Sequence, residues 1–145
     1  MANDTNLGAL LSNEQIVFRA FTEKSFRERP KRVRSGAYLL REIDIEDGLS
    51  VGLSPEAAVK YLDRNEGYCS IPIGEIRSLP YGLDVTIDKT DPAHAFIRNL
   101  PYLKTSDEHR ERAMLIAGDL ARRSKVITCD PYIPAAISPE SSTHS

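Results

Sequence analysis

The sequence has no tryptophan, only two cysteines and only two methionines among its 145 residues. No apolar run approaches the about 20 residues that a membrane-spanning helix needs, so no membrane partner is expected. Residues 1–10 have no basic segment followed by an apolar one, so no secretory signal is expected. Cys69 and Cys129 stand far apart, without further cysteines or a histidine at metal-ligand spacing. We therefore expect reduced thiols, no metal site and a cytoplasmic protein.

An excess of charge of one sign is also missing. Nineteen basic and 21 acidic residues give a net charge of −2, which argues against a general nucleic-acid binder. The distribution is less even, because residues 27–34 hold five bases and one acid, and residues 42–47 hold four acids. A solvated surface loop is the favoured interpretation of the basic run. The alternative is an RNA-interacting protein that contacts phosphates through Arg29, Lys31, Arg32 and Arg34.

The two ends of the sequence are polar, or rich in proline and serine. We expect flexible tails over residues 1–6 and 133–145, and a single domain over residues 7–132. Strands are predicted at 15–21, 36–45, 49–51, 68–73, 83–87, 94–97 and 125–128. Helices are predicted at 54–64 and 105–124, with Ser54 and Thr105 as their N-caps, and a short helix or loop is expected around Phe26.

These elements predict an α+β fold. It has a mixed or antiparallel sheet of about five to six short strands and about three helices, and the long C-terminal helix packs on the sheet. The apolar pattern predicts eight buried side chains. They are Ile16, Phe18, Leu39, Val85, Ile87, Ile97, Ile116 and Leu120.

Two polar residues stand at positions where chemistry is possible. His94 opens a predicted strand after a loop, which suits acid–base catalysis or a phosphate contact, although a bond to a backbone carbonyl would explain it as well. Arg19 lies in an otherwise apolar strand and needs a partner there. That partner is either a carboxylate, such as Glu42 or Asp84, or an anionic ligand held by the planar guanidinium.

No established nucleophile or nucleotide motif is present, since G-x-S-x-G, G-x-x-x-x-G-K and G-x-G-x-x-G are all missing. One arrangement resembles a known family, however. The segment Val17-Phe18-Arg19-Ala20 is followed by Leu49-Ser50-Val51 and then by the capped helix that starts at Ser54-Pro55-Glu56. This order over residues 16–62 is similar to the first half of the ADP-ribosyltransferase-like fold.

The resemblance implies that Arg19 and Ser50 contact a dinucleotide, with NAD as the cofactor or substrate. In that family a late strand often carries a catalytic Glu-x-Glu motif, which this sequence lacks, and Glu75 is the nearest candidate for the carboxylate. The missing motif favours a non-catalytic relative.

The favoured function is therefore a small cytoplasmic binding or accessory module, without catalysis or cofactor, for a protein partner or an anionic small ligand. The first alternative is an NAD-using transferase or glycohydrolase, in which Glu75 and His94 would be catalytic. The second alternative is the RNA-interacting protein described above.

Overall fold

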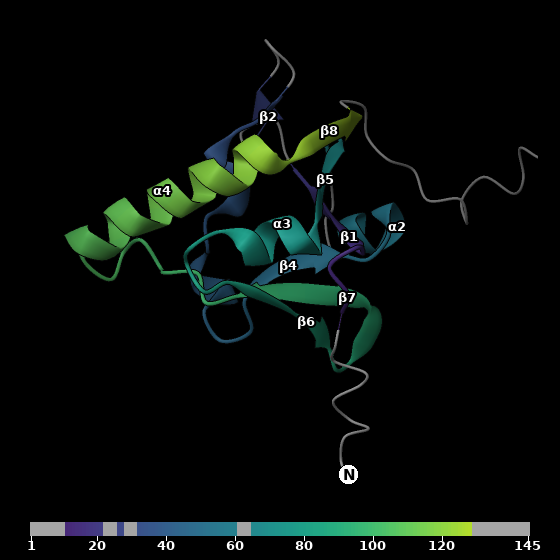
Figure 1. Cartoon of the computed structure of the whole chain (residues 1–145), viewed down its shortest axis with the longest axis horizontal. Helices are drawn as coiled ribbons and strands as arrows, with labels where there is room; N and C mark the ends of the chain where they lie inside the picture. Colours follow the sequence, from purple (N-terminus) through teal and green to yellow (C-terminus); the bar gives the residue numbers. More distant parts are fainter. Residues whose placement is uncertain (1–10, 22–25, 28–31, 61–64, 129–145) are drawn as a thin grey trace, which may run out of the picture.

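The computed structural model describes residues 11–21, 26–27, 32–60 and 65–128 (Figure 1). The predicted tails and the two ends of the predicted domain lie outside these residues. The described part forms a six-stranded antiparallel sheet with helices packed on it, which confirms the predicted α+β fold.

The main sheet has the spatial order β6-β7-β4-β1-β5-β8, and every neighbouring pair is antiparallel. Its strands are β1 (Ile16–Ala20), β4 (Leu49–Gly52), β5 (Tyr68–Pro72), β6 (Asp84–Asp88), β7 (Asp91–Arg98) and β8 (Lys125–Thr128). A second sheet pairs only β2 (Phe26–Arg27) with β3 (Arg32–Val33), so Phe26 lies in a strand instead of the expected helix or loop. In Figure 1, β8 forms one edge of the main sheet and the β6–β7 hairpin forms the other.

Three α-helices lie in the described part: α2 (Pro55–Val59), α3 (Ile73–Ser78) and α4 (Asp107–Arg123). Ser54 caps α2 as predicted, because its hydroxyl accepts a hydrogen bond from the amide of Ala57 at 3.1 Å. The cap of α4 is Ser106 and not Thr105, since the Ser106 hydroxyl accepts from the amide of His109 at 3.1 Å.

The strand predicted over residues 36–45 is wrong. Two 3₁₀ helices, η2 (Ser35–Tyr38) and η3 (Glu42–Asp44), occupy this segment instead. Asp44 stabilises η3, because its carboxylate accepts hydrogen bonds from both the amide and the guanidinium of Arg41 and so closes the turn. This local side-chain bond competes successfully with the alternating apolar pattern.

α3 was not predicted. The apolar pattern of residues 68–73 suggested a strand up to Ile73, but β5 ends at Pro72 and α3 begins directly after it. Pro72 has the extended backbone that suits a residue before the first helical turn, with φ −68° and ψ 144°. Ile73 and Ile76 are then fully buried on one side of this short helix.

The main core lies between one face of the sheet and the helices α3 and α4. Of the eight side chains expected in it, Val85, Ile97, Ile116 and Leu120 are buried, whereas Phe18, Leu39 and Ile87 are only partly buried. Ile16 is 44% exposed, so its predicted burial is wrong. Since alternate residues of a strand point to opposite faces, β1 directs Val17 into the main core, and Phe18 and Ala20 to the other face.

α2 covers that other face of the sheet. Val59 packs with Ala20 and Tyr68 in a second, smaller apolar cluster. The fit is close at Gly52, where an added Cβ would lie 2.3 Å from the amide nitrogen of Ala58. Glycine at this position therefore lets the backbone of α2 rest on β4.

No helix in the described part of the chain is long and apolar enough to cross a membrane.

The apolar face of α4 allows a direct test of how this helix packs on the core. Leu120 is fully buried, whereas Leu115 on the same helix is 56% exposed. We expect Leu120→Ala to lower the free energy of unfolding by about 2–5 kcal/mol, because it removes buried methyl groups and leaves a cavity. Leu115→Ala should change it by less than about 0.5 kcal/mol. Urea denaturation followed by circular dichroism measures both values, and equal losses would contradict the assigned helix face.

Candidate functional site

Three polar side chains meet on the face of the sheet that α2 covers. Ser50 lies opposite Phe96 in the β4–β7 pair, and Gly52 lies opposite His94, so Ser50 and His94 point to the same face. Asp88 ends β6 at the tight turn before β7, where it lies opposite Asp91. The antiparallel pairing thus brings together residues that stand far apart in the sequence.

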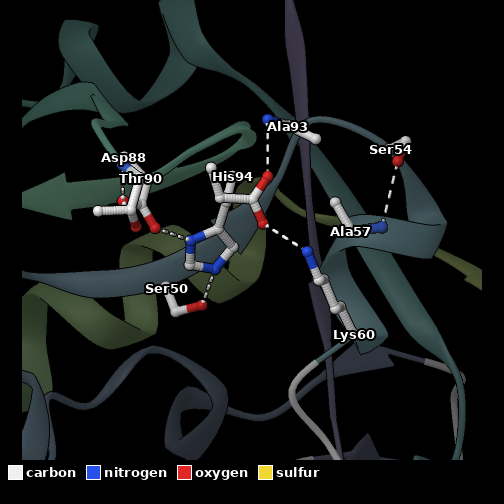
Figure 2. Close-up of polar contacts among 9 residues, drawn as sticks. Ser50, Ser54, Ala57, Lys60, Asp88, Thr90, Ala93 and His94 are labelled. Carbon is white, nitrogen blue, oxygen red and sulfur yellow. Dashed lines mark hydrogen bonds and ion pairs between the residues drawn. The ribbon is translucent and has the colours of Figure 1, made fainter.

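These side chains form a continuous hydrogen-bonded relay (Figure 2). The Ser50 Oγ is 2.5 Å from His94 Nε2, and His94 Nδ1 is 3.1 Å from Asp88 Oδ2. The His94 side chain is 5% exposed and that of Asp88 is 15% exposed. Figure 2 shows the imidazole between Ser50 on one side and Asp88 with Thr90 on the other.

The relay has a definite direction of hydrogen bonding. An ionised carboxylate only accepts, so Nδ1 of His94 carries the proton that it donates to Asp88. In the neutral ring, Nε2 then accepts the hydroxyl proton of Ser50. The other carboxylate oxygen of Asp88 accepts from the Thr90 amide at 2.9 Å and from its hydroxyl at 2.8 Å. Both oxygens of Asp88 are therefore held in place.

The environment favours the charged form of Asp88. Desolvation opposes ionisation, but the hydrogen bonds from the Thr90 amide, the Thr90 hydroxyl and His94 outweigh it and lower the pKa of Asp88 below the ordinary 3.8. The relay thus contains a carboxylate that remains ionised at neutral pH.

A second group of contacts joins the start of β7 to α2. The Lys60 ammonium, just after α2, lies 3.0 Å from Asp91 Oδ2, and the other oxygen of Asp91 accepts from the Ala93 amide at 3.2 Å (Figure 2). Since His94 directly follows Ala93, these bonds help to position its backbone beside α2.

Arg19 lies on the opposite face of the sheet, in the main core. Its Nε donates to the carbonyl oxygen of Ala37 and its Nη1 to the carbonyl oxygen of Ser50, each at 2.8 Å. Burial lowers the pKa of Arg19 from its ordinary value. No carboxylate of the described residues forms an ion pair with it, so neither Glu42 nor Asp84 is the expected partner.

The carboxylate that acts on the charge of Arg19, that of Asp44, is already occupied. Asp44 accepts from Arg41 Nε at 2.9 Å and from Arg41 Nη2 at 3.2 Å, in a two-pronged ion pair. Arg41 and Asp44 influence the pKa of Arg19 in opposite directions, which places both of them near its guanidinium. The group Arg19–Arg41–Asp44 therefore carries one positive charge that no described carboxylate balances.

The other polar neighbours of Arg19 are neutral. The Tyr38 hydroxyl lies 2.6 Å from Ser124 Oγ and 3.4 Å from the Cys69 sulfur. Burial raises the pKa of the Tyr38 hydroxyl and of the Cys69 thiol, which keeps both groups protonated. They add hydrogen-bonding groups beside Arg19, but no negative charge.

The remaining predicted site residues lie elsewhere. Glu75 is on α3, and its carboxylate contacts Arg123 of α4 at 2.5 Å, not the relay. Arg34 is exposed before η2. Arg29 and Lys31 lie outside the described residues, as does the side chain of Arg32, so the RNA-binding hypothesis stays a prediction. Among the described residues, no three His, Cys, Asp or Glu side chains could hold a metal ion.

Arg19 and His94 were singled out from the residues themselves and Ser50 only through the family resemblance, whereas Asp88 was missed. The segments around residues 83–87 and 94–97 were both predicted as strands, but they were not paired with each other. A short antiparallel hairpin would have brought an acid at the end of the first strand toward a histidine at the start of the second. That pairing was the available signal for Asp88.

No protein-family model matches the chain, and no significant match exists among the curated proteins or the solved structures.

Acid conditions test the ionised state of Asp88. A carboxyl whose pKa is lowered by folding adds stability above its ordinary pKa, and this contribution is lost as the pH falls below that value. We therefore expect Asp88→Asn to destabilise the protein at pH 7, and expect its difference from the wild type to shrink as the pH falls below about 4.

Urea unfolding at a series of pH values measures this difference. Glu14→Gln is the control, because it removes one carboxylate from an exposed position before β1. A difference for Asp88→Asn that stays constant from pH 7 to about pH 3 would contradict the assignment.

Proposed function

We propose that the protein binds a small anionic ligand through Arg19. The observation that carries this proposal is the charge of the group Arg19–Arg41–Asp44, in which the single carboxylate is already paired with Arg41 and both charges act on Arg19. A cation taken out of water without a counter-ion is costly, and an anion from solution would remove that cost. Phosphate and carboxylate groups are the ligands that a planar guanidinium binds best.

Arg19 has donors left for such a ligand. Its Nε and Nη1 are used by the carbonyl oxygens of Ala37 and Ser50, whereas Nη2 has no hydrogen bond to a described residue. The residue also keeps part of its surface accessible. The two carbonyl bonds fix the plane of the guanidinium, so little side-chain entropy is lost when an anion binds.

The alternative of an NAD-using enzyme places a phosphate on the same residue. In the described structure Arg19 contacts the carbonyl of Ser50, while the hydroxyl of Ser50 faces His94 on the other side of the sheet. Glu75 contacts Arg123. These contacts favour an anion site at Arg19 over an assembled NAD-cleaving site, and the alternative stays open to direct assay.

Binding can be measured by calorimetric titration with pyrophosphate, ADP and NAD, each at low ionic strength. We expect at least one of them to bind the wild type, and Arg19→Met to bind it about 10- to 100-fold more weakly because a charged hydrogen bond is lost. The affinity of Arg19→Lys should lie between those of the wild type and Arg19→Met, since lysine keeps the charge but not the planar donors.

Arg112→Met is the matched control, because it removes an exposed arginine from α4 and should leave the affinity unchanged. If Arg112→Met lost as much affinity as Arg19→Met, the ligand would be attracted by the net charge of the protein and not by a site at Arg19. Absence of binding by the folded wild type would contradict the proposal and leave the protein-partner hypothesis, for which exposed Ile43 and Ile45 are the first residues to test. Nicotinamide release from NAD, measured in the same samples, tests the enzyme alternative.

A further inference from the structure

We propose that Ser50 is a nucleophile activated by His94, with Asp88 as the positioning residue, and that the site hydrolyses small uncharged carboxylic esters. This goes beyond the anion site at Arg19, which lies on the other face of the sheet. The proposal rests on the complete Ser–His–Asp connection, with Oγ–Nε2 at 2.5 Å and Nδ1–Oδ2 at 3.1 Å. The serine oxygen, the two imidazole nitrogens and the carboxylate are connected in the same order as in the catalytic triad of a serine hydrolase.

Asp88 has the features that a positioning carboxylate needs. It stays ionised because its pKa is lowered, and Thr90 holds the oxygen that does not face His94. Its bond to Nδ1 fixes the tautomer in which Nε2 accepts the proton of Ser50. The ring of Phe96 contacts the His94 ring edge-on at 5.2 Å between centroids and restrains its tilt.

The surroundings of Ser50 indicate the class of substrate. Ser50 is partly exposed, and its neighbour on β7 is the half-buried Phe96. The pairing of Phe18 with Gly52 places Ala20 on its other side, on β1. Two residues along β4 from Ser50, the backbone of α2 rests on Gly52 and covers that part of the sheet. These neighbours are apolar and uncharged, which suits a small acyl group and disfavours a charged one.

The chemical step balances with water as the only co-reactant. Ser50 Oγ attacks the ester carbonyl carbon while its proton passes to His94 Nε2. The C–O bond to the alcohol then breaks, and the alcohol leaves with that proton. Water attacks the acyl group on Ser50, again giving a proton to His94, and the carboxylic acid leaves as Ser50 Oγ regains its proton.

The same chain contains an internal comparison. Ser106 Oγ lies 2.9 Å from His109 Nδ1 at the exposed start of α4. This pair includes no carboxylate of the described residues. The Ser106 hydroxyl is also the acceptor for the His109 amide, so it serves as the helix cap. If the complete relay matters, Ser50 and not Ser106 should react with an electrophile.

Diisopropyl fluorophosphate provides the test, since Oγ–P bond formation expels fluoride and the serine proton passes to histidine. The full chain is treated with the reagent, and the modified residue is located by peptide mass spectrometry. We expect labelling at Ser50 and none at Ser106. His94→Gln should slow labelling at least about 100-fold, and Asp88→Asn at least about tenfold. Hydrolysis of 4-nitrophenyl acetate should follow the same order, and Ser50→Ala should abolish it.

The pH profile separates activation from a structural role. Only neutral imidazole accepts a proton, so labelling of the wild type should depend on pH and fall under acid conditions. This measurement decides the matter even if His94→Gln fails to fold. No label on Ser50, under conditions that modify a serine protease standard, would overturn the proposal. Labelling that is independent of pH or equal in folded His94→Gln would also overturn it.

Discussion

The hydrogen bond from Arg19 to the carbonyl oxygen of Ser50 connects the two faces of the molecule. The same guanidinium also binds the carbonyl of Ala37, so it holds η2 against β4. On the other face the hydroxyl of Ser50 bonds to His94. The position of β4 between β1 and β7 makes both contacts possible, because only a central strand has a neighbour on each side. Arg19 therefore contacts the same residue that carries the serine of the relay.

The sequence predicted elements well where one pattern dominated. The cap at Ser54 and the apolar stripe with Ile116 and Leu120 identified α2 and α4, and both helices are present. It was wrong where local polar bonds compete with apolar periodicity, as at residues 36–45, where the Arg41–Asp44 contact closes a 3₁₀ turn. The predicted burial of Ile16 is wrong for another reason. β1 is apolar on both faces, so its pattern alone does not identify the side that faces the core.

The candidate site could be predicted only in part, because the sequence shows which residues are unusual but not which residues they contact. Residue type and position singled out Arg19 and His94, and the family resemblance added Ser50, but the partners of all three depend on strand pairing. The contacts of Arg19 are backbone carbonyls, which the identity of a residue does not reveal. Asp88 joins His94 only because β6 and β7 form a hairpin with a register shift near Asp88. Register, and not composition, decides which charged groups meet.

The placement of Cys69 also has a consequence for how the protein can be studied. Its sulfur is fully buried beside Tyr38, and burial raises the pKa of the thiol. Thiolate is the reactive form, and water-soluble alkylating reagents reach the sulfur only after the core around it opens. The rate at which Cys69 is alkylated in the native protein thus reports how often the core beside β5 opens, without any engineered probe.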